Sequence, residues 1–407
     1  MSQSVILDQF GRNHTFAHAA NRSTRRGPQF ATRNDDIDRL INTRDREVVA
    51  SLSNRMFTNM GVPRACLQQK AGHSVGEAWI PSYCGPDQEA GKQAAKVLRD
   101  IFLPQCEIRG GVFDWWKVLK LKSVGVDRDG DSFVMLVNDD GMPKIQLIPG
   151  HRCSSGRTGF SGTPMKVEDG PFKGKQIIDG IIYNEKSQPI AYRFLLGKKP
   201  NAEFRDVPAS DVIHLFDPTH SEQGRGFPAF IHALEGMKMS LLSTEDERIR
   251  QQIISRLHLT VFNQTGGPSE EDIGSQLLGQ DGQPAGEFST KDFPGGTMYL
   301  TANSGEKVEQ MKHDNPGVVW EAFQDRMVRD AVLPVWSYSI WKGAGQGTAE
   351  RAEVVKVRRF IKERQSLLRM SARRIISWAY SVFAEQGIVP QLEEPTNWKF
   401  SLPPRLS

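Results

Sequence analysis

The stretch IDGIIYNEKSQPIAYRFLLGKKPNAEFRDVPASDVIHLFDPTHSEQGRGFPAF, residues 178–230, decides the fold of this chain. An apolar run at 180–183 is followed by a polar turn and by a second apolar run at 189–196. Alternating apolar and polar positions on both sides of such a turn predict an antiparallel hairpin. A third extended run occupies 207–216, and Arg225-Gly226-Phe227-Pro228 then leads into a helix, since proline is favoured at a helix start.

His214 is the residue of this stretch that most resembles a catalytic group. It lies between Ile213 and Leu215, and successive side chains of a strand point to opposite faces. The two apolar neighbours therefore share one face of the strand, and His214 takes the other. We expect a structural histidine rather than a ligand or a general base.

The composition narrows the class of protein. With 407 residues, the chain can bury a large core and form two or three domains or one large irregular domain. Its 38% hydrophobic and 25% charged content is globular, neither fibrous nor disordered. The 52 basic and 48 acidic residues give a net charge of +4, which is too small by itself to indicate a nucleic-acid-binding protein.

The four cysteines give no sign of a metal site or a disulfide framework. Cys66, Cys84, Cys106 and Cys153 are scattered, with no CxxC pair or matching histidine, so we expect reduced thiols. The sequence also has no run of about 18 apolar residues and no signal-peptide pattern. We therefore expect a soluble protein with no membrane partner that works where it is made.

The remaining segments differ in their apolar spacing. Residues 1–35 are rich in arginine and small polar residues and predict an extended basic arm. Two short β-type runs joined by Asn138-Asp139-Asp140-Gly141 predict a second hairpin. Apolar residues spaced by three and four predict helices, and the segments with this spacing are 36–60, which Gly61-Val62-Pro63 should end, 87–102, 113–121, 229–262, 318–336 and 349–386.

Asp127, Asp129 and Asp131 form the motif most typical of an enzyme. Three carboxylates at alternate positions are similar to a calcium loop, but such a loop needs glycine at its sixth position and glutamate at its twelfth. This sequence has Ser132 and Asn138 there. We expect a solvated turn that leads into a strand. The three aspartates remain the only basis for the alternative hypothesis of a metal-dependent DNA-processing enzyme.

Two further segments could contact phosphates. Gly343, Gly345 and Gly347 precede a helix, but neither GxGxxG nor GxxxxGK[ST] is present, so we expect a loop and not a nucleotide site. Residues 350–374 hold nine basic and three acidic residues. This helix face is expected to be solvated, to contact acidic neighbouring subunits, or to face phosphates, and the last option supports the alternative of a nucleic-acid-binding module.

The order of these motifs resembles the portal proteins of tailed bacteriophages, specifically the lambda-like portal family. The family combines such a hairpin with a Pro-Ala step, a strand with a central histidine and an Arg-Gly-apolar-Pro step, here Pro208-Ala209, His214 and Arg225-Gly226-Phe227-Pro228. The resemblance implies an α+β portal fold and a ring-shaped oligomer, typically a dodecamer. Its central channel would lie at one capsid vertex and pass DNA during packaging and ejection.

The resemblance also implies a division of the chain. After the basic arm at 1–35, the expected parts are a wing at 36–228, a first stem helix at 229–262, a clip at 263–312, a second stem helix at 313–336, a tunnel loop at 337–348, a long inner wing helix at 349–386 and the start of a crown at 387–407. Family members commonly continue beyond this last segment.

The implied partners are further copies of the chain, double-stranded DNA, the large terminase subunit, head–tail adaptor proteins, and the major capsid and scaffolding proteins. The implied locations are the virion and, during assembly, the host cytoplasm. No catalytic residue, metal or cofactor is expected. The expected channel residues are Trp341, Lys342, Gly343, Gly345, Gln346 and Gly347, and the basic residues expected to face DNA or another subunit are Arg248, Arg256, Arg326, Arg329, Arg358 and Arg359.

Deleting residues 343–347 tests the expected tunnel loop. A channel loop contacts DNA rather than the neighbouring subunit, so the deletion should leave ring assembly intact and reduce DNA packaging or retention. Particle mass and packaged DNA per particle measure the two effects. Loss of assembly would contradict the channel role.

Overall fold

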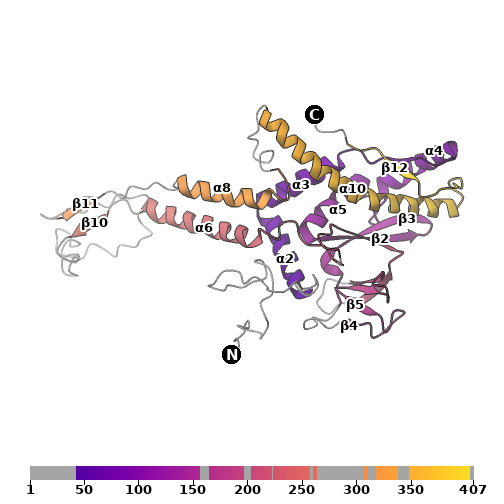
Figure 1. Ribbon diagram of the computed structural model, residues 1–407, viewed down its shortest axis with the longest axis horizontal. Coiled ribbons are helices and arrows are strands. Elements are labelled where there is room, and N and C mark those ends of the chain that lie inside the picture. The colour runs from indigo at the N-terminus through magenta and orange to yellow at the C-terminus, as the bar shows by residue number, and fades with distance from the viewer. Residues whose placement is uncertain are drawn as a thin grey trace, which may run out of the picture. The chain divides into compact units, whose positions relative to one another are not determined.

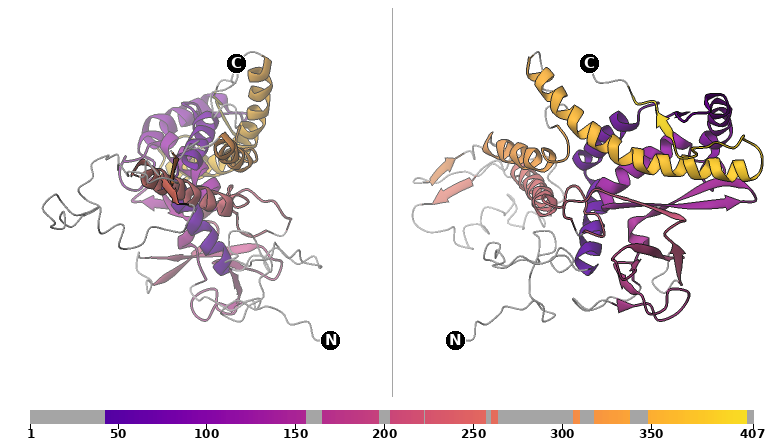
Figure 2. Two further views of the ribbon diagram at one scale, coloured as in Figure 1. Left: turned by 90° about the vertical axis from the view of Figure 1, so that its left-hand side faces the viewer. Right: turned by 45° about the vertical axis from the view of Figure 1, so that its right-hand side comes forward.

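The computed structural model describes residues 43–155, 165–196, 203–221, 223–256, 260–263, 306–309, 318–337 and 348–403. The chain forms two compact units, one made of Met1–Glu235 with Val328–Ser407 and the other of Gly236–Met327. Helices and antiparallel sheets are both present, as expected for the α+β class (Figures 1 and 2). No described helix is long and apolar enough to cross a membrane.

Among the described residues, five α-helices lie wholly in the first unit: α2 (Thr43–Asn59), α3 (Gly61–Val75), α4 (Gln88–Val97), α5 (Trp115–Asp129) and α10 (Thr348–Glu385). Aspartate side chains cap two of them, because free backbone N–H groups at a helix start need acceptors. Asp87 accepts from the Ala90 N–H at 3.0 Å, and Asp114 accepts from the Lys117 N–H at 2.7 Å. A π-helical turn (Leu98–Phe102) and a 3-10 turn (Leu103–Gln105) continue α4.

The two larger sheets of this unit are antiparallel. The first has the order β3-β2-β9, with β2 at Asp131–Asp139, β3 at Met142–Pro149 and β9 at Val212–Phe216. The second runs β4 (Met165–Lys166), β5 (Gln176–Ile178), β6 (Ile181–Tyr183), β7 (Pro189–Leu195) and β8 (Phe204–Pro208). Both hairpins expected from the sequence are confirmed: β6 pairs with β7, and β2 pairs with β3 through a turn where Gly141 has a φ of +89°.

The main core lies beneath α10, which packs against β3 and β9 and lies along the β2–β3 hairpin (Figure 1). Its buried residues, such as Ile375 and Phe383, share a cluster with Trp115 of α5 and Trp398 of β12 (Trp398–Phe400). Strand β12 pairs with β1 (Pro81–Tyr83), so residues 398–400 lie beside residues 81–83. The observed bounds of α10 agree closely with the helix expected at 349–386.

The second unit contains most of two helices and a small hairpin. Helix α6 (Leu234–Arg256) and helix α8 (Val318–Val332) are linked by hydrogen bonds from Ser240 to Gln324 and from the Trp320 indole to the Ser243 hydroxyl, the latter at 3.2 Å. Strands β10 (Thr260–Asn263) and β11 (Glu306–Glu309) pair antiparallel. Three of the paired positions of this hairpin, 260 to 262, fall where the sequence predicted the end of a helix.

Several expected element bounds are wrong. The helix expected at 229–262 begins at Leu234 and ends at Arg256, because the residues after Pro228 form turns and Thr260–Asn263 pairs as a strand. Gly61-Val62-Pro63 ends α2 but also opens α3, where Pro63 lies in the first turn and needs no N–H partner. The helix expected at 113–121 continues to Asp129.

The cysteines are all free, in agreement with the sequence. Burial raises the pKa of Cys66, Cys106 and Cys153 to about 12. These three thiols therefore stay protonated at neutral pH and contribute to the fold as small apolar groups.

Lys122 is a buried amine, and its burial lowers the free energy of unfolding at neutral pH. It lies on α5 and donates to the Ser371 hydroxyl of α10 at 2.8 Å, and burial lowers its pKa from 10.5 to about 7. Between pH 7 and 10 the unfolded chain holds this proton and the folded chain does not, so stability rises with pH by about 1.4 kcal/mol for each unit.

Replacing Lys122 by methionine should therefore stabilise the protein at pH 7, by roughly 2 kcal/mol. At the slope of about 1.4 kcal/mol per unit, the advantage should fall by about 4 kcal/mol between pH 7 and 10, so the wild type should become the more stable protein before pH 10. Thermal unfolding at several pH values measures this, with Lys120→Met on the same helix as control. A constant advantage from pH 7 to 10 would contradict the account.

Candidate functional site

Asp131 and Arg225 form the centre of a buried network at the start of β2. The Arg225 Nε donates to Asp131 Oδ2 at 2.7 Å, and both side chains are at most 6% exposed. The other Arg225 nitrogens donate to backbone carbonyls of Cys153, Asp179 and Gly150 at 2.6 to 3.1 Å. The guanidinium thus joins the turn at 150–153 to the turn at Asp179, which is distant in sequence.

The charge state of Asp131 follows from these neighbours. Burial by itself would raise its pKa, but Arg225, and then His214, outweigh burial and hold the pKa below its usual value. Asp131 Oδ1 also accepts the backbone N–H of Gly226 at 2.8 Å. The carboxylate is therefore ionised at neutral pH and has hydrogen bonds on both oxygens.

His214 has the structural role expected from the sequence. Its Nε2 lies 2.7 Å from Asp131 Oδ1, and its ring stacks between Phe133 and Phe216, with centroids 4.3 and 4.6 Å away. Burial lowers the pKa of His214, although Asp131 opposes that shift. The neutral ring therefore donates its Nε2–H to the carboxylate and points away from Ile213 and Leu215.

Arg46 extends the network to helix α2. It donates to Asp179 Oδ2 at 2.9 Å and to the Gly226 carbonyl at 3.0 Å, and its guanidinium lies over the Phe227 ring at 4.8 Å. Gly226 must be glycine, because a Cβ there would overlap the carbonyl oxygen of Gly130. Each residue of Arg225-Gly226-Phe227 thus has a fixed contact in the first unit.

Asp127 forms a second buried cluster on the last turn of α5. It binds the Lys70 ammonium of α3 at 3.1 Å and the Arg364 guanidinium of α10. Burial lowers the pKa of Lys70, although Asp127 opposes the shift. The backbone carbonyl of Asp127 accepts the N–H of Ala229 at 2.7 Å, which connects α5 to the segment that precedes α6.

The expectation of a solvated turn at the three aspartates is therefore wrong. Asp127 and Asp129 lie inside α5, Asp131 begins β2, and all three are buried. Asp129 pairs with Arg128 at 2.7 Å, so each aspartate has its own cation. The sequence around the three aspartates did not indicate this burial, because Lys70, Arg225 and Arg364 lie far from them in the sequence.

These aspartates do not fit a metal site. A divalent ion needs oxygen ligands that converge on one point, whereas here every carboxylate is committed to a different basic group. Within the described ranges, no group of three or more His, Cys, Asp or Glu side chains could hold a metal ion. The network can fix backbone geometry, and it offers no group placed for acid–base or nucleophilic chemistry.

The residues expected to act in the channel lie mostly outside the described part of the chain. This holds for Trp341, Lys342, Gly343, Gly345, Gln346 and Gly347, and the Arg256 side chain is not described either. Arg248 is exposed on α6 and pairs with Glu245 at 2.9 Å. Arg326 and Arg329 are exposed on α8, and Arg359 is exposed on α10 beside the half-buried Arg358. Their roles stay predictions.

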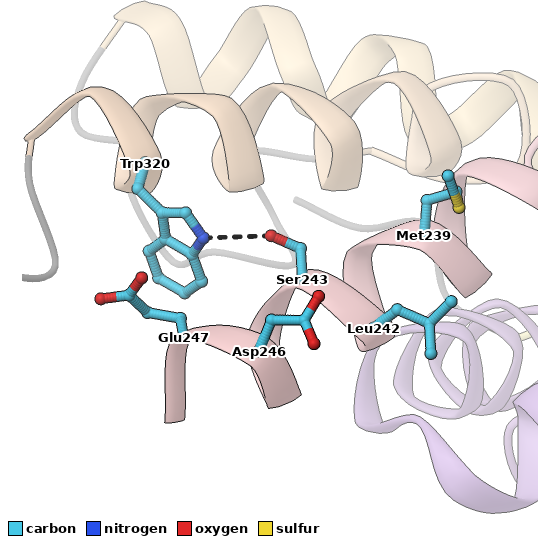
Figure 3. A pocket seen from close by; sticks show the side chains of 6 residues that line it. All are labelled: Met239, Leu242, Ser243, Asp246, Glu247 and Trp320. Atoms are coloured by element: carbon cyan, nitrogen blue, oxygen red, sulfur yellow. Dashed lines mark hydrogen bonds between the residues drawn. The ribbon is translucent and has the colours of Figure 1, made fainter. Parts of the chain in front are cut away.

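An apolar surface is exposed on the helices of the second unit. Met239 and Leu242 of α6, 60% and 51% exposed, line a hollow of about 480 Å³ together with Trp320 of α8 (Figure 3). Ser243, Asp246 and Glu247 complete its lining. Sequence reasoning noted the apolar spacing of α6 but could not tell which of these side chains remain uncovered.

Comparison with known proteins identifies the family. The model of the family described as "Phage portal protein, lambda family" matches residues 23–365, most of the chain. The chain belongs to the lambda family of phage portal proteins. This confirms the resemblance drawn from the sequence, and the protein is a portal, the connector between head and tail. No curated protein matches the sequence.

Two solved neck structures share the fold of this chain. A chain from the neck of a native gene transfer agent particle computed with C12 symmetry matches with a TM-score of 0.52 and 10% identity over 86% of this chain and 82% of that chain. The neck of an empty particle computed with C6 symmetry gives 0.50 and 10% over 87% and 84%. An HK97-family phage portal protein from Corynebacterium diphtheriae gives 0.35 and 11% over 76% and 84%.

Replacing Arg225 by methionine tests the buried network. Asp131 would stay buried without its main cation, so the portal protein should lose about 3–5 kcal/mol of unfolding free energy. Adding Asp131→Asn should recover part of the loss, because the two residues are coupled. Urea unfolding measures both, with exposed Arg205→Met on β8 as control. Equal effects of the two arginine variants would contradict the account.

Proposed function

We propose that this portal protein assembles into a ring, of about twelve copies, whose channel carries double-stranded DNA during packaging and ejection. The family match over 23–365 is the observation that carries the proposal. The neck structures with the same fold were computed with C12 and C6 symmetry, and rings of identical subunits have such closed rotational symmetry.

The exposed face of α6 supports assembly from copies of the chain. Met239, Leu242, Asp246 and Ile249 recur at intervals of three and four and so share one helix face. The three apolar side chains are 46–60% exposed, and Phe323 of α8 is 52% exposed. Burying an apolar surface gives about 25 cal/mol for each Å², so a neighbouring subunit would stabilise this face.

The division into wing, stem, clip, tunnel loop, inner wing helix and crown is part of the proposal. In it, α6 and α8 are the stem helices, and the β10–β11 hairpin begins and ends the clip. The large terminase subunit and the head–tail adaptors would bind at the clip, and the capsid and scaffolding proteins would surround the wing. Assembly would take place in the host cytoplasm before incorporation into the virion.

Within this proposal the protein is not an enzyme and needs no cofactor. Portal proteins are structural, and the aspartates that could have supported metal-dependent chemistry are committed to Lys70, Arg128, Arg225 and Arg364. A conduit should also hold DNA weakly, because many phosphate contacts would slow its movement. A net charge of +4 on 407 residues suits this requirement.

Mass photometry of the purified full chain tests the proposal. Twelve copies of a 45.6 kDa chain amount to about 550 kDa, and we expect a particle near that mass. Leu242→Glu combined with Ile249→Glu should reduce it to small species, since charges would face the neighbouring subunit. Thr244→Glu, an exposed position on another side of α6, should leave the particle intact. A wild-type chain that stays monomeric would contradict the proposal.

A further inference from the structure

Helix α10 has a larger net positive charge than the whole chain. Its 38 residues include nine Lys or Arg and four Glu, a net charge of +5, whereas the complete chain is +4. All other residues together are therefore slightly acidic. A charge excess concentrated on one helix indicates a specific electrostatic surface more strongly than the modest total does.

This charge lies on the solvent side of α10. Positions 357, 361, 364, 368, 372 and 375 are buried and form the opposite side of the helix. Between 355 and 374 the only exposed acidic residue is Glu363. The exposed basic residues of the same segment are Lys356, Arg359, Lys362, Arg369, Arg373 and Arg374, which we call the α10 basic face.

Four side chains of the α10 basic face have no acidic partner among the residues that the structure describes: Lys362, Arg369, Arg373 and Arg374. Arg359 pairs with Glu363 at 2.9 Å. Arg373 donates to the backbone carbonyl of Trp398 at 3.2 Å, and Arg374 donates to that of Ala209 at 2.7 Å. These neutral acceptors orient the two side chains but do not neutralise their charge. In the part of the chain that the structure describes, neither Lys362 nor Arg369 forms a salt bridge.

We propose that the α10 basic face binds the phosphate backbone of double-stranded DNA without regard to sequence. From Arg359 to Arg373 the helix is about 21 Å long. One DNA strand places a phosphate every 3.4 Å or so along the axis, so about six phosphates span that length. The face offers lysine and arginine donors, which serve phosphates well, and its exposed apolar residues, Val355 and Met370, are isolated.

A second copy of the chain is a poorer partner for this face. The described residues contain a single run of three acidic side chains, Glu245, Asp246 and Glu247, and Arg248 already pairs with the first. That run covers one helical turn, whereas the basic face covers about four. Duplex DNA matches both the length and the charge of the α10 basic face. The inference rests on the proposed function, which brings DNA to this protein.

The test is DNA binding by the purified full chain, with a 30-base-pair duplex of random sequence as the probe. Fluorescence anisotropy between 50 and 200 mM salt gives the slope of log affinity against log salt, expected at about −3 to −4 for four phosphate contacts. Lys362→Glu combined with Arg369→Glu should weaken binding at least tenfold and make the slope shallower by about 2.

Lys173→Glu combined with Lys186→Glu is the matched control. Both lysines are exposed in turns of the sheet formed by β4 to β8, and the change in net charge is the same. This variant should alter affinity less than threefold. Equal weakening by the two variants, or an unchanged slope, would overturn the inference. The inference would also be overturned if the Lys362→Glu and Arg369→Glu variant lost the 550 kDa particle but kept its DNA affinity. That result would show that the face lies between subunits. Absence of that particle in the wild type would instead contradict the proposed function.

Discussion

The rest of this structure depends on the buried pair of Asp131 and Arg225. A buried ion pair adds little net stability, but leaving one of its charges buried without a partner is strongly destabilising. The pair therefore acts mainly by disfavouring backbone arrangements in which Asp131 and Arg225 do not meet. Arg225 uses its remaining donors on three backbone carbonyls in two turns, and Asp131 binds Gly226 and His214 as well. A hydrophobic pair of the same volume could fill the space but could not fix these backbone groups.

This pair gives the family's Arg-Gly-apolar-Pro step a physical meaning. Arg225 supplies the charge, Gly226 allows the contact with Gly130, and Phe227 lies under Arg46. The Asp127 carbonyl then holds Ala229, five residues before α6 begins. The hairpin-rich sheets and the start of α6 are thereby joined without any catalytic group, which is what a structural connector requires.

Local patterns in the sequence predicted what local interactions determine. The β6–β7 and β2–β3 hairpins and the bounds of α10 follow from turn residues and apolar periodicity, and all agree with the structure. The role of Asp127 and Asp131 could not be predicted, because Lys70, Arg225 and Arg364 come from distant parts of the chain. Helix α3 was missed because Pro63 resembles a stop signal when its place in a first turn is unknown.

The central claim is that copies of this chain form a portal ring. Two-dimensional class averages of the purified particle, obtained by negative-stain electron microscopy, test it most directly. The account predicts end views with closed rotational symmetry, about twelve repeats and a central hole that admits duplex DNA. Averages that show compact single chains, or open filaments without a hole, would contradict it.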